Sequence, residues 1–179
     1  MKLTKLGVLS LIIIIGMNAC ATTENTSVES ISETSSIFPA WYEPVETVHD
    51  SLNYVAFATA IAADSVKAID RAEIQARIHL EKKIAQLTEE IRIDLEASGS
   101  TSVSNTDFII ILRTAHFGVE AAAMPLQAIS KKTEGYYRGF SSVQISKSDI
   151  KSVLEKGFTG HPRYWGEYSS SSMFLSYFE

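Results

Sequence analysis

A long helical pattern between Asp64 and Ala97 constrains the fold of this chain more than any other feature of its sequence. Apolar residues recur there at spacings of three and four, as on one face of an amphipathic α-helix: Ile69, Ala72, Ala76, Leu80, Ile84, Leu87, Ile91 and Leu95. Asp64 is of a residue type that caps helix starts. At 1.5 Å per residue this helix would span about 51 Å. We therefore expect it either to extend beyond the sheet that it covers or to break.

Strand patterns flank the helical segment on both sides. Residues 52–62 (LNYVAFATAIA) predict a buried strand, which a helix approaches closely across its small residues, Ala56, Ala58 and Ala60. Residues 126–132 and 136–145 surround the short segment Thr133-Glu134-Gly135, which is typical of a hairpin. The sequence thus predicts an α+β fold, with a small antiparallel sheet packed against one long helix and shorter helices.

The remaining segments are less sharply defined. Residues 108–120 suit either a strand or a helix, and the spacing of their apolar residues favours a helix. Residues 146–157 predict a short helix capped by Ser146 or Ser148 and ended by Gly157. The aromatic- and serine-rich tail, residues 158–179, could pack on the domain or capture a partner, and packing is the favoured interpretation.

The N-terminal residues have the order of an export signal. Lys2 and Lys5 precede an apolar run from Leu6 to Ile15, which is shorter than the roughly 20 residues of a transmembrane helix. The only cysteine, Cys20, follows directly after Met17, Asn18 and Ala19. This arrangement resembles the lipobox of bacterial lipoproteins, although asparagine is unusual at its second position.

The lipobox resemblance implies a particular processing of the chain. Met17, Asn18 and Ala19 would be recognised by the lipoprotein signal peptidase, and residues 1–19 would be removed. Cys20 would carry diacylglycerol and an N-acyl chain, which suffice for stable anchoring. Ala21 resembles the residue found in the outer-membrane class. We expect outer-membrane localisation with the domain facing the periplasm.

Domain boundaries follow from the composition of the chain. Residues 20–45 hold the lipidated cysteine and a Ser/Thr/Glu-rich tether. In its last part, Trp41, Tyr42 and Pro44 are expected to dock on the domain. Residues 46–157 form the domain, and residues 158–179 form the tail.

Two segments of the domain resemble a known family. The pattern Ala68-x3-Ala72-x3-Ala76-Arg77-x2-Leu80-x3-Ile84 follows the strand YVAFATAIA, and EGYYRGFSSVQISKSDIKSVL comes later. Together they resemble the LPP-twenty lipoproteins of bacterial outer membranes, whose domain is similar to the N-terminal domain of flagellar assembly protein T. The resemblance covers residues 50–157, and implies a compact domain on a lipid anchor without catalytic residues.

The sequence contains few signs of catalysis, metal binding or nucleic-acid binding. The four histidines, His49, His79, His116 and His161, have no helical metal-ligand spacing, and His79 is expected at the surface. Nucleophile-elbow, P-loop and dinucleotide-binding motifs are absent from the sequence. The segment RGFSSVQI partly matches an RNA-recognition strand, but Ser142 replaces the stacking aromatic and the net charge is −5. We expect no enzyme activity, no metal or other cofactor and no nucleic-acid partner.

The expected function is therefore binding at the cell envelope. Aromatic side chains at two places are the candidate contacts for an envelope protein partner: Tyr136, Tyr137, Phe140, Tyr164 and Trp165. By analogy with the family, that partner could belong to flagellar or envelope assembly. The alternative is a periplasmic lipoprotein that binds a small molecule or a glycan, with the aromatic tail lying over the sheet.

Overall fold

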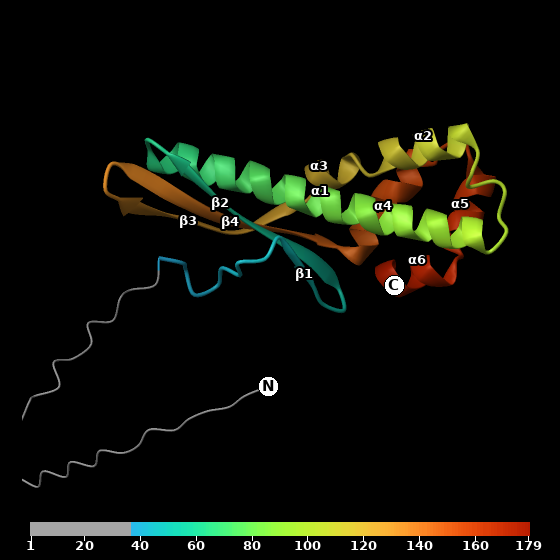
Figure 1. The fold of residues 1–179 in the computed structure, drawn as a ribbon, viewed down its shortest axis with the longest axis horizontal. Helices are drawn as coiled ribbons and strands as arrows, with labels where there is room; N and C mark the ends of the chain where they lie inside the picture. Colours follow the sequence, from blue (N-terminus) through green and yellow to red (C-terminus); the bar gives the residue numbers. More distant parts are fainter. Residues whose placement is uncertain (1–36) are drawn as a thin grey trace, which may run out of the picture. The chain divides into compact units, whose positions relative to one another are not determined.

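A single long helix, α1 (Ser65–Ala97), is the central element of the domain. A computed structural model describes residues 37–179, so the predicted signal peptide, Cys20 and most of the predicted tether lie outside the described residues. Figure 1 shows the sheet along the first part of α1 and the shorter helices around its second part. The α+β class expected from the sequence is confirmed, and α1 extends beyond its sheet without breaking.

The start and buried face of α1 agree with the sequence pattern. The side chain of Asp64 accepts a hydrogen bond from the Lys67 amide at 2.8 Å, which caps the helix. The predicted apolar stripe is buried from Ala72 to Ile91, but Ile69 is only half-buried. Ala68 is buried in its place, and its backbone lies against Gly139 of the sheet.

The sheet has four antiparallel strands in the order β1-β2-β4-β3. They are β1 (Thr47–His49), β2 (Asn53–Ala62), β3 (Met124–Thr133) and β4 (Tyr136–Ser146). The predicted strand at 52–62 is β2, and the predicted hairpin is β3 and β4. Its two-residue turn holds Gly135 at a φ of +82°, a conformation that glycine adopts without strain.

Small residues let α1 approach the sheet. Ala56 and Ala58 of β2 are buried beneath the helix, whereas Ala60 is half-buried. On β4, Gly139 lies so close to α1 that a Cβ atom there would meet the Ala68 carbonyl. The alanine-rich segments of strand and helix therefore serve close packing, as the sequence predicts.

Shorter helices surround the part of α1 that extends beyond the sheet. They are α2 (Thr106–Ala115), α3 (Gly118–Ala122), α4 (Lys147–Gly157), α5 (Pro162–Ser169) and α6 (Ser172–Phe178). The segment 108–120 is thus helical, in two pieces. Ser146 caps α4 through a 3.0 Å bond from the Asp149 amide.

The C-terminal tail is part of the core. Tyr168, Phe174 and Phe178 of α5 and α6 are buried against the rest of the domain. The Tyr168 hydroxyl donates to the Thr88 carbonyl oxygen of α1 at 2.8 Å. Residues 158–179 therefore pack on the domain, and the sequence-based boundary at residue 157 crosses one continuous core.

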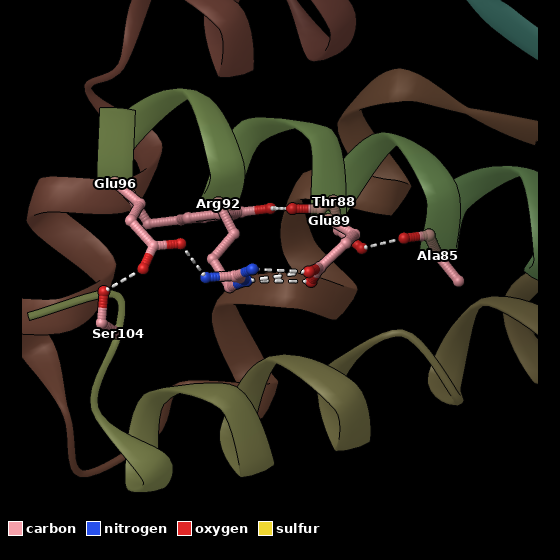
Figure 2. A network of polar contacts seen from close by, with 7 residues as sticks. Ala85, Thr88, Glu89, Arg92, Glu96 and Ser104 are labelled. Carbon is pink, nitrogen blue, oxygen red and sulfur yellow. Dashed lines mark hydrogen bonds and ion pairs between the residues drawn. The ribbon is translucent and has the colours of Figure 1, made fainter. Parts of the chain in front are cut away.

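Ion pairs and hydrogen bonds between polar side chains link the end of α1 to the loop that follows it (Figure 2). Arg92 pairs with Glu89 at 2.7 Å and with Glu96 at 2.9 Å, and Glu96 also accepts from the Ser104 hydroxyl. These bonds lower the pKa of Glu96, with the Ser104 hydroxyl as the largest cause. The network holds the loop after α1 against the helix.

Candidate interaction surface

The five predicted contact residues do not form one surface. Phe140 is fully buried, whereas Tyr136 and Tyr137 are half-buried beside the β3–β4 turn. Tyr164 and Trp165 belong to α5, where they pack against the aromatic core of the helical end. The β3–β4 turn and α5 lie at opposite ends of the domain (Figure 1). The five side chains therefore do not come together in a single aromatic patch.

Phe140 is covered by the segment before β1. We call residues 37–46 the strap, because they cross the face of the sheet that is turned away from α1. Phe38 and Tyr42 of the strap stack at 5.5 Å, and both rings meet Phe140 edge-on, at 5.8 and 5.1 Å. The expected docking of Tyr42 is thus confirmed. The last part of the predicted tether packs on the sheet as part of the domain.

His79 lies off the buried stripe, as expected from the sequence, but it is half-buried and makes two structural hydrogen bonds. Its Nδ1 lies 2.9 Å from the Phe57 carbonyl oxygen of β2, and its Nε2 lies 2.9 Å from the Gln75 side-chain nitrogen. A carbonyl only accepts, so Nδ1 carries the proton and Nε2 accepts from Gln75. Arg71 likewise donates to the Ile61 carbonyl at 3.2 Å. Two side chains of α1 thereby hydrogen-bond to backbone carbonyls of β2 on the part of its edge that β1 does not cover.

A cleft of about 260 Å³ lies between the strap, β2 and α1, and opens widely to solvent. Its apolar wall includes Phe38, Tyr42 and Phe57, and its polar groups come from Glu46, Thr59, Gln75 and His79. Burial raises the pKa of Tyr42, against an opposing effect of Arg138. The Lys82 ammonium lowers the pKa of Glu46. We call this concavity the strap cleft.

The most exposed apolar strand of the domain is β3. Met124, Leu126 and Ile129 are 66%, 45% and 42% exposed. β3 pairs with β4 on one side, and within the described residues no strand pairs with its other side. An irregularity between Pro125 and Gln127 breaks the ladder near the start of the strand. β3 is therefore an open edge that a bulge and a proline interrupt at one end.

Cationic side chains gather at the other end of β3. Lys131 lies opposite Arg138 of β4, and Lys132 lies opposite Tyr137 with its ammonium 6.0 Å from the ring centre. Glu134 in the turn is the only carboxylate between Met124 and Phe140. Thr133 and Arg138 lower the pKa of the nearby Tyr136 hydroxyl. This end of the sheet is thus locally positive on a chain whose net charge is −5.

The sequence analysis identified the β3–β4 hairpin but not its open edge. An edge position depends on strand order, and the pairing of β2 with β4 joins residues about 80 positions apart, as in the Thr59 to Gly139 hydrogen bond. The apolar residues Met124, Leu126 and Ile129 were the available signal in the sequence, but Pro125 and Ala128 weaken the strand pattern.

The described part of the chain offers few groups for other functions. Among residues 37–179, no three His, Cys, Asp or Glu side chains are placed to hold a metal ion. None of the helices within that range is long and apolar enough to span a membrane. The Ser141 and Ser142 hydroxyls of β4 are buried, and no described residue is a hydrogen-bond partner for either of them.

Comparison with known proteins adds no further constraint: no protein-family model, curated protein or solved structure matches the chain. The resemblance to the LPP-twenty lipoproteins remains a prediction.

Proposed function

We propose that the chain is a lipid-anchored protein of the bacterial outer membrane, whose domain faces the periplasm and binds another envelope protein without catalysing a reaction. The observation that carries the binding role is the open edge of β3, with its three exposed apolar side chains. Long exposed strand edges of this kind invite pairing with another chain. A link to flagellar or envelope assembly rests on the family resemblance alone.

The anchor rests on the position of Cys20 behind a short apolar run and Ala19. One acyl chain gives only reversible membrane binding, whereas a lipoprotein cysteine carries three. A lone cysteine otherwise behaves as a small buried hydrophobe or a free thiol. Neither alternative accounts for its place directly after an export-type segment.

The shape of the domain favours a protein partner over an enclosed ligand. Ligand pockets bury most of their ligand and bring a few polar groups together inside a cavity. The principal concavities lined by described residues, about 260 to 550 Å³ in volume, are open to solvent. They suit single side chains of a partner better than a whole small molecule.

The strap cleft supports the second candidate function, the binding of a glycan or another small molecule. The exposed ring of Phe38 beside Gln75 and His79 offers an apolar platform with polar groups at its rim. Phe38→Ala would then abolish binding of a soluble envelope glycan while preserving the partner protein. Loss of the protein partner in Phe38→Ala, with no glycan bound by the unaltered chain, would exclude this second function.

The anchor is tested by Cys20→Ser, with Ala21→Ser as the matched control. In cells fed an alkyne-labelled fatty acid, we expect Cys20→Ser to lose the acyl label and to accumulate as uncleaved precursor. Ala21→Ser should remain labelled and processed. Equal labelling of both variants would contradict the anchor.

The binding role is tested by crosslinking the tagged, full-length protein in cells and identifying its neighbours. One dominant protein neighbour is expected. Recovery of abundant bystanders alone would contradict the binding role and favour the glycan-binding alternative.

A further inference from the structure

We propose that β3 binds its partner by strand addition: an extended, acidic segment of the partner pairs with the outer edge of β3 between Ala128 and Lys132. This inference rests on the proposed binding function and deepens it. It specifies the surface, the mode of recognition and the chemistry of the partner. Strand addition is a common way for sheet edges to bind peptides, with backbone hydrogen bonds giving affinity and side chains giving specificity.

The register of the sheet identifies the backbone groups available at this edge. The Phe57 amide donates to the Glu46 carbonyl on the β1 side, so Ala58 directs its own backbone groups to β4. Ala58 lies opposite Ser141, whose N–H and C=O therefore face β2.

The same alternation then fixes the outer side of β3. Ala128 lies opposite Ser141 on the far side of β4, so its N–H and C=O face away from β4. Backbone groups of a strand alternate between its two sides, and those of Ser130 and Lys132 also face outward. Three consecutive pairing positions are thus presented at the edge.

The opposite edge of the sheet is not equivalent. There, β1 pairs with the first part of β2, and the Phe57 and Ile61 carbonyls are capped by His79 and Arg71. The outer side of β1 is only three residues long, and beyond β1 the described residues leave only the position of Thr59 between the two capped carbonyls. Neither stretch offers as long a ladder as β3, so β3 is the edge best suited to receive a partner.

Both faces of β3 match an acidic segment with apolar residues. Ile129 and Lys131 share the strap-side face of the sheet with Phe140 and Arg138, and Lys132 lies on the α1 side over Tyr137. Residues directly opposite on paired strands have Cβ atoms about 4.5–5.5 Å apart. An added strand would therefore bring its carboxylates to the two lysines and an apolar side chain to Ile129.

The same charges disfavour pairing between two copies of β3. A second copy would bring another Lys131 and Lys132 to a positive edge. At the start of β3, Pro125 and the bulge interrupt the ladder, which limits any added strand to the region beyond Gln127. The open strand edge requires the added segment to be extended, and charge complementarity favours one that is acidic.

Binding is tested with the full-length lipidated protein in detergent micelles and two labelled peptides. The probe is acetyl-Glu-Glu-Thr-Val-Thr-Val-amide, whose adjacent glutamates lie opposite Lys132 and Lys131, and whose first valine lies opposite Ile129, in an antiparallel register. The control peptide has lysine at both glutamate positions. We expect the acidic peptide to bind at least tenfold more tightly at physiological salt. Equal affinities, or no binding of the acidic peptide, would overturn the proposal.

Two variants test separately the contribution of backbone pairing and the contribution of the lysine charges to binding. Proline is tolerated where a strand N–H faces outward, so Ser130→Pro should fold and yet lose detectable binding. Lys131→Glu/Lys132→Glu should bind at least tenfold more weakly. The matched charge reversal Lys156→Glu/Arg163→Glu, on α4 and α5, should bind normally. A Ser130→Pro protein that folds and retains full affinity would contradict strand addition.

Amide hydrogen exchange provides the direct readout. The acidic peptide should slow exchange at Ala128, Ser130 and Lys132, while the amides between them, already directed to β4, should change little. Uniform or absent protection would contradict the inference. Protection that exists without peptide and disappears in Glu29→Gln/Glu33→Gln would assign the edge to the chain's own acidic segment. Protection that rises with protein concentration would assign it to a second copy, and either result overturns the partner assignment.

Crosslinking in cells separates this inference from the proposed function. If Ser130→Pro keeps the neighbour of the unaltered protein, the domain binds that neighbour through another surface and only the inference fails. If the unaltered protein has no specific neighbour, the proposed function itself fails.

Discussion

The carbonyl oxygen of Ala68 lies 2.1 Å from the position that a Cβ atom at Gly139 would occupy. Helix α1 and strand β4 are therefore in direct backbone contact, and no side chain fits between them. Gly139→Ala would force the helix away from the sheet. We expect the free energy of unfolding to fall by about 3 kcal/mol, at the upper end of typical overpacking costs, as measured by urea denaturation.

Gly166→Ala is the matched control for this prediction. A Cβ atom at Gly166 would meet no heavy atom within 4 Å apart from its chain neighbours and the backbone of its own helix, and the residue lies inside α5. Because alanine is the better helix former, we expect this variant to be more stable by about 0.5–1 kcal/mol. Similar losses in the two variants would contradict the close contact between α1 and β4.

A second prediction concerns the buried stripe of α1. Ala76 is fully buried against the sheet, so Ala76→Leu adds volume where none is available. We expect a loss of about 1–3 kcal/mol in the free energy of unfolding. Ala97→Leu, at the exposed end of the same helix, should change stability by less than about 0.5 kcal/mol. An unchanged melting temperature in Ala76→Leu would remove this face of α1 from the core.

Local patterns predicted the elements that local forces specify. The stripe of α1, the turn before Gly135 and the Ser146 cap all depend on neighbours within a few residues. Strand β1 was missed because it has three residues, too few to show alternation. Helices α5 and α6 were not predicted as helices because they are short and are joined by a run of serines at residues 169–172. The burial of Tyr168, Phe174 and Phe178 stabilises them.

The candidate site was less predictable than the fold for the same reason. An aromatic side chain looks equally suited to a core or to a contact surface, and Phe140 proved to be core. The structural role of His79 was not predicted because its partner, the Phe57 carbonyl, belongs to a strand edge that exists only after folding. The open edge of β3 likewise depends on which strands become neighbours.

A third prediction concerns Arg77, which fastens α3 to α1. Its guanidinium donates to the Glu120 and Ala123 carbonyl oxygens at 2.8 and 2.6 Å, and pairs with Glu73 at 2.8 Å. Arg77→Met would leave these carbonyls without their charged donor. We expect the free energy of unfolding to fall by about 2 kcal/mol and amide exchange to become faster across residues 118–123.

Arg92→Met is the matched control for Arg77, since Arg92 pairs with two half-exposed carboxylates of α1 and, among the described residues, donates to no backbone carbonyl of another element. Ion pairs of this kind contribute at most about 1 kcal/mol and weaken in salt. If Arg77→Met lowers the free energy of unfolding by no more than Arg92→Met does, the link between α3 and α1 is not a major source of stability.

The last prediction concerns stability at high pH. Burial, followed by a smaller effect of Tyr177, raises the pKa of Tyr54 to about 12, and burial also raises the pKa of Tyr168. An unfolded tyrosine titrates near a pKa of about 10. The folded state then binds the proton more tightly, so the stability that the Tyr54 hydroxyl contributes is complete below about pH 10 and is lost as the pH rises from 10 through 12.

Tyr54→Phe tests this linkage, because phenylalanine cannot ionise. We expect the free energy of unfolding to fall less steeply between pH 10 and pH 12 in this variant than in the unaltered protein. Tyr136→Phe is a control of opposite sign: Thr133 and Arg138 lower the pKa of Tyr136, so its ionised form favours the folded state at high pH. Its removal should make the alkaline loss steeper, and parallel pH profiles for the two variants would contradict the buried position of the Tyr54 hydroxyl.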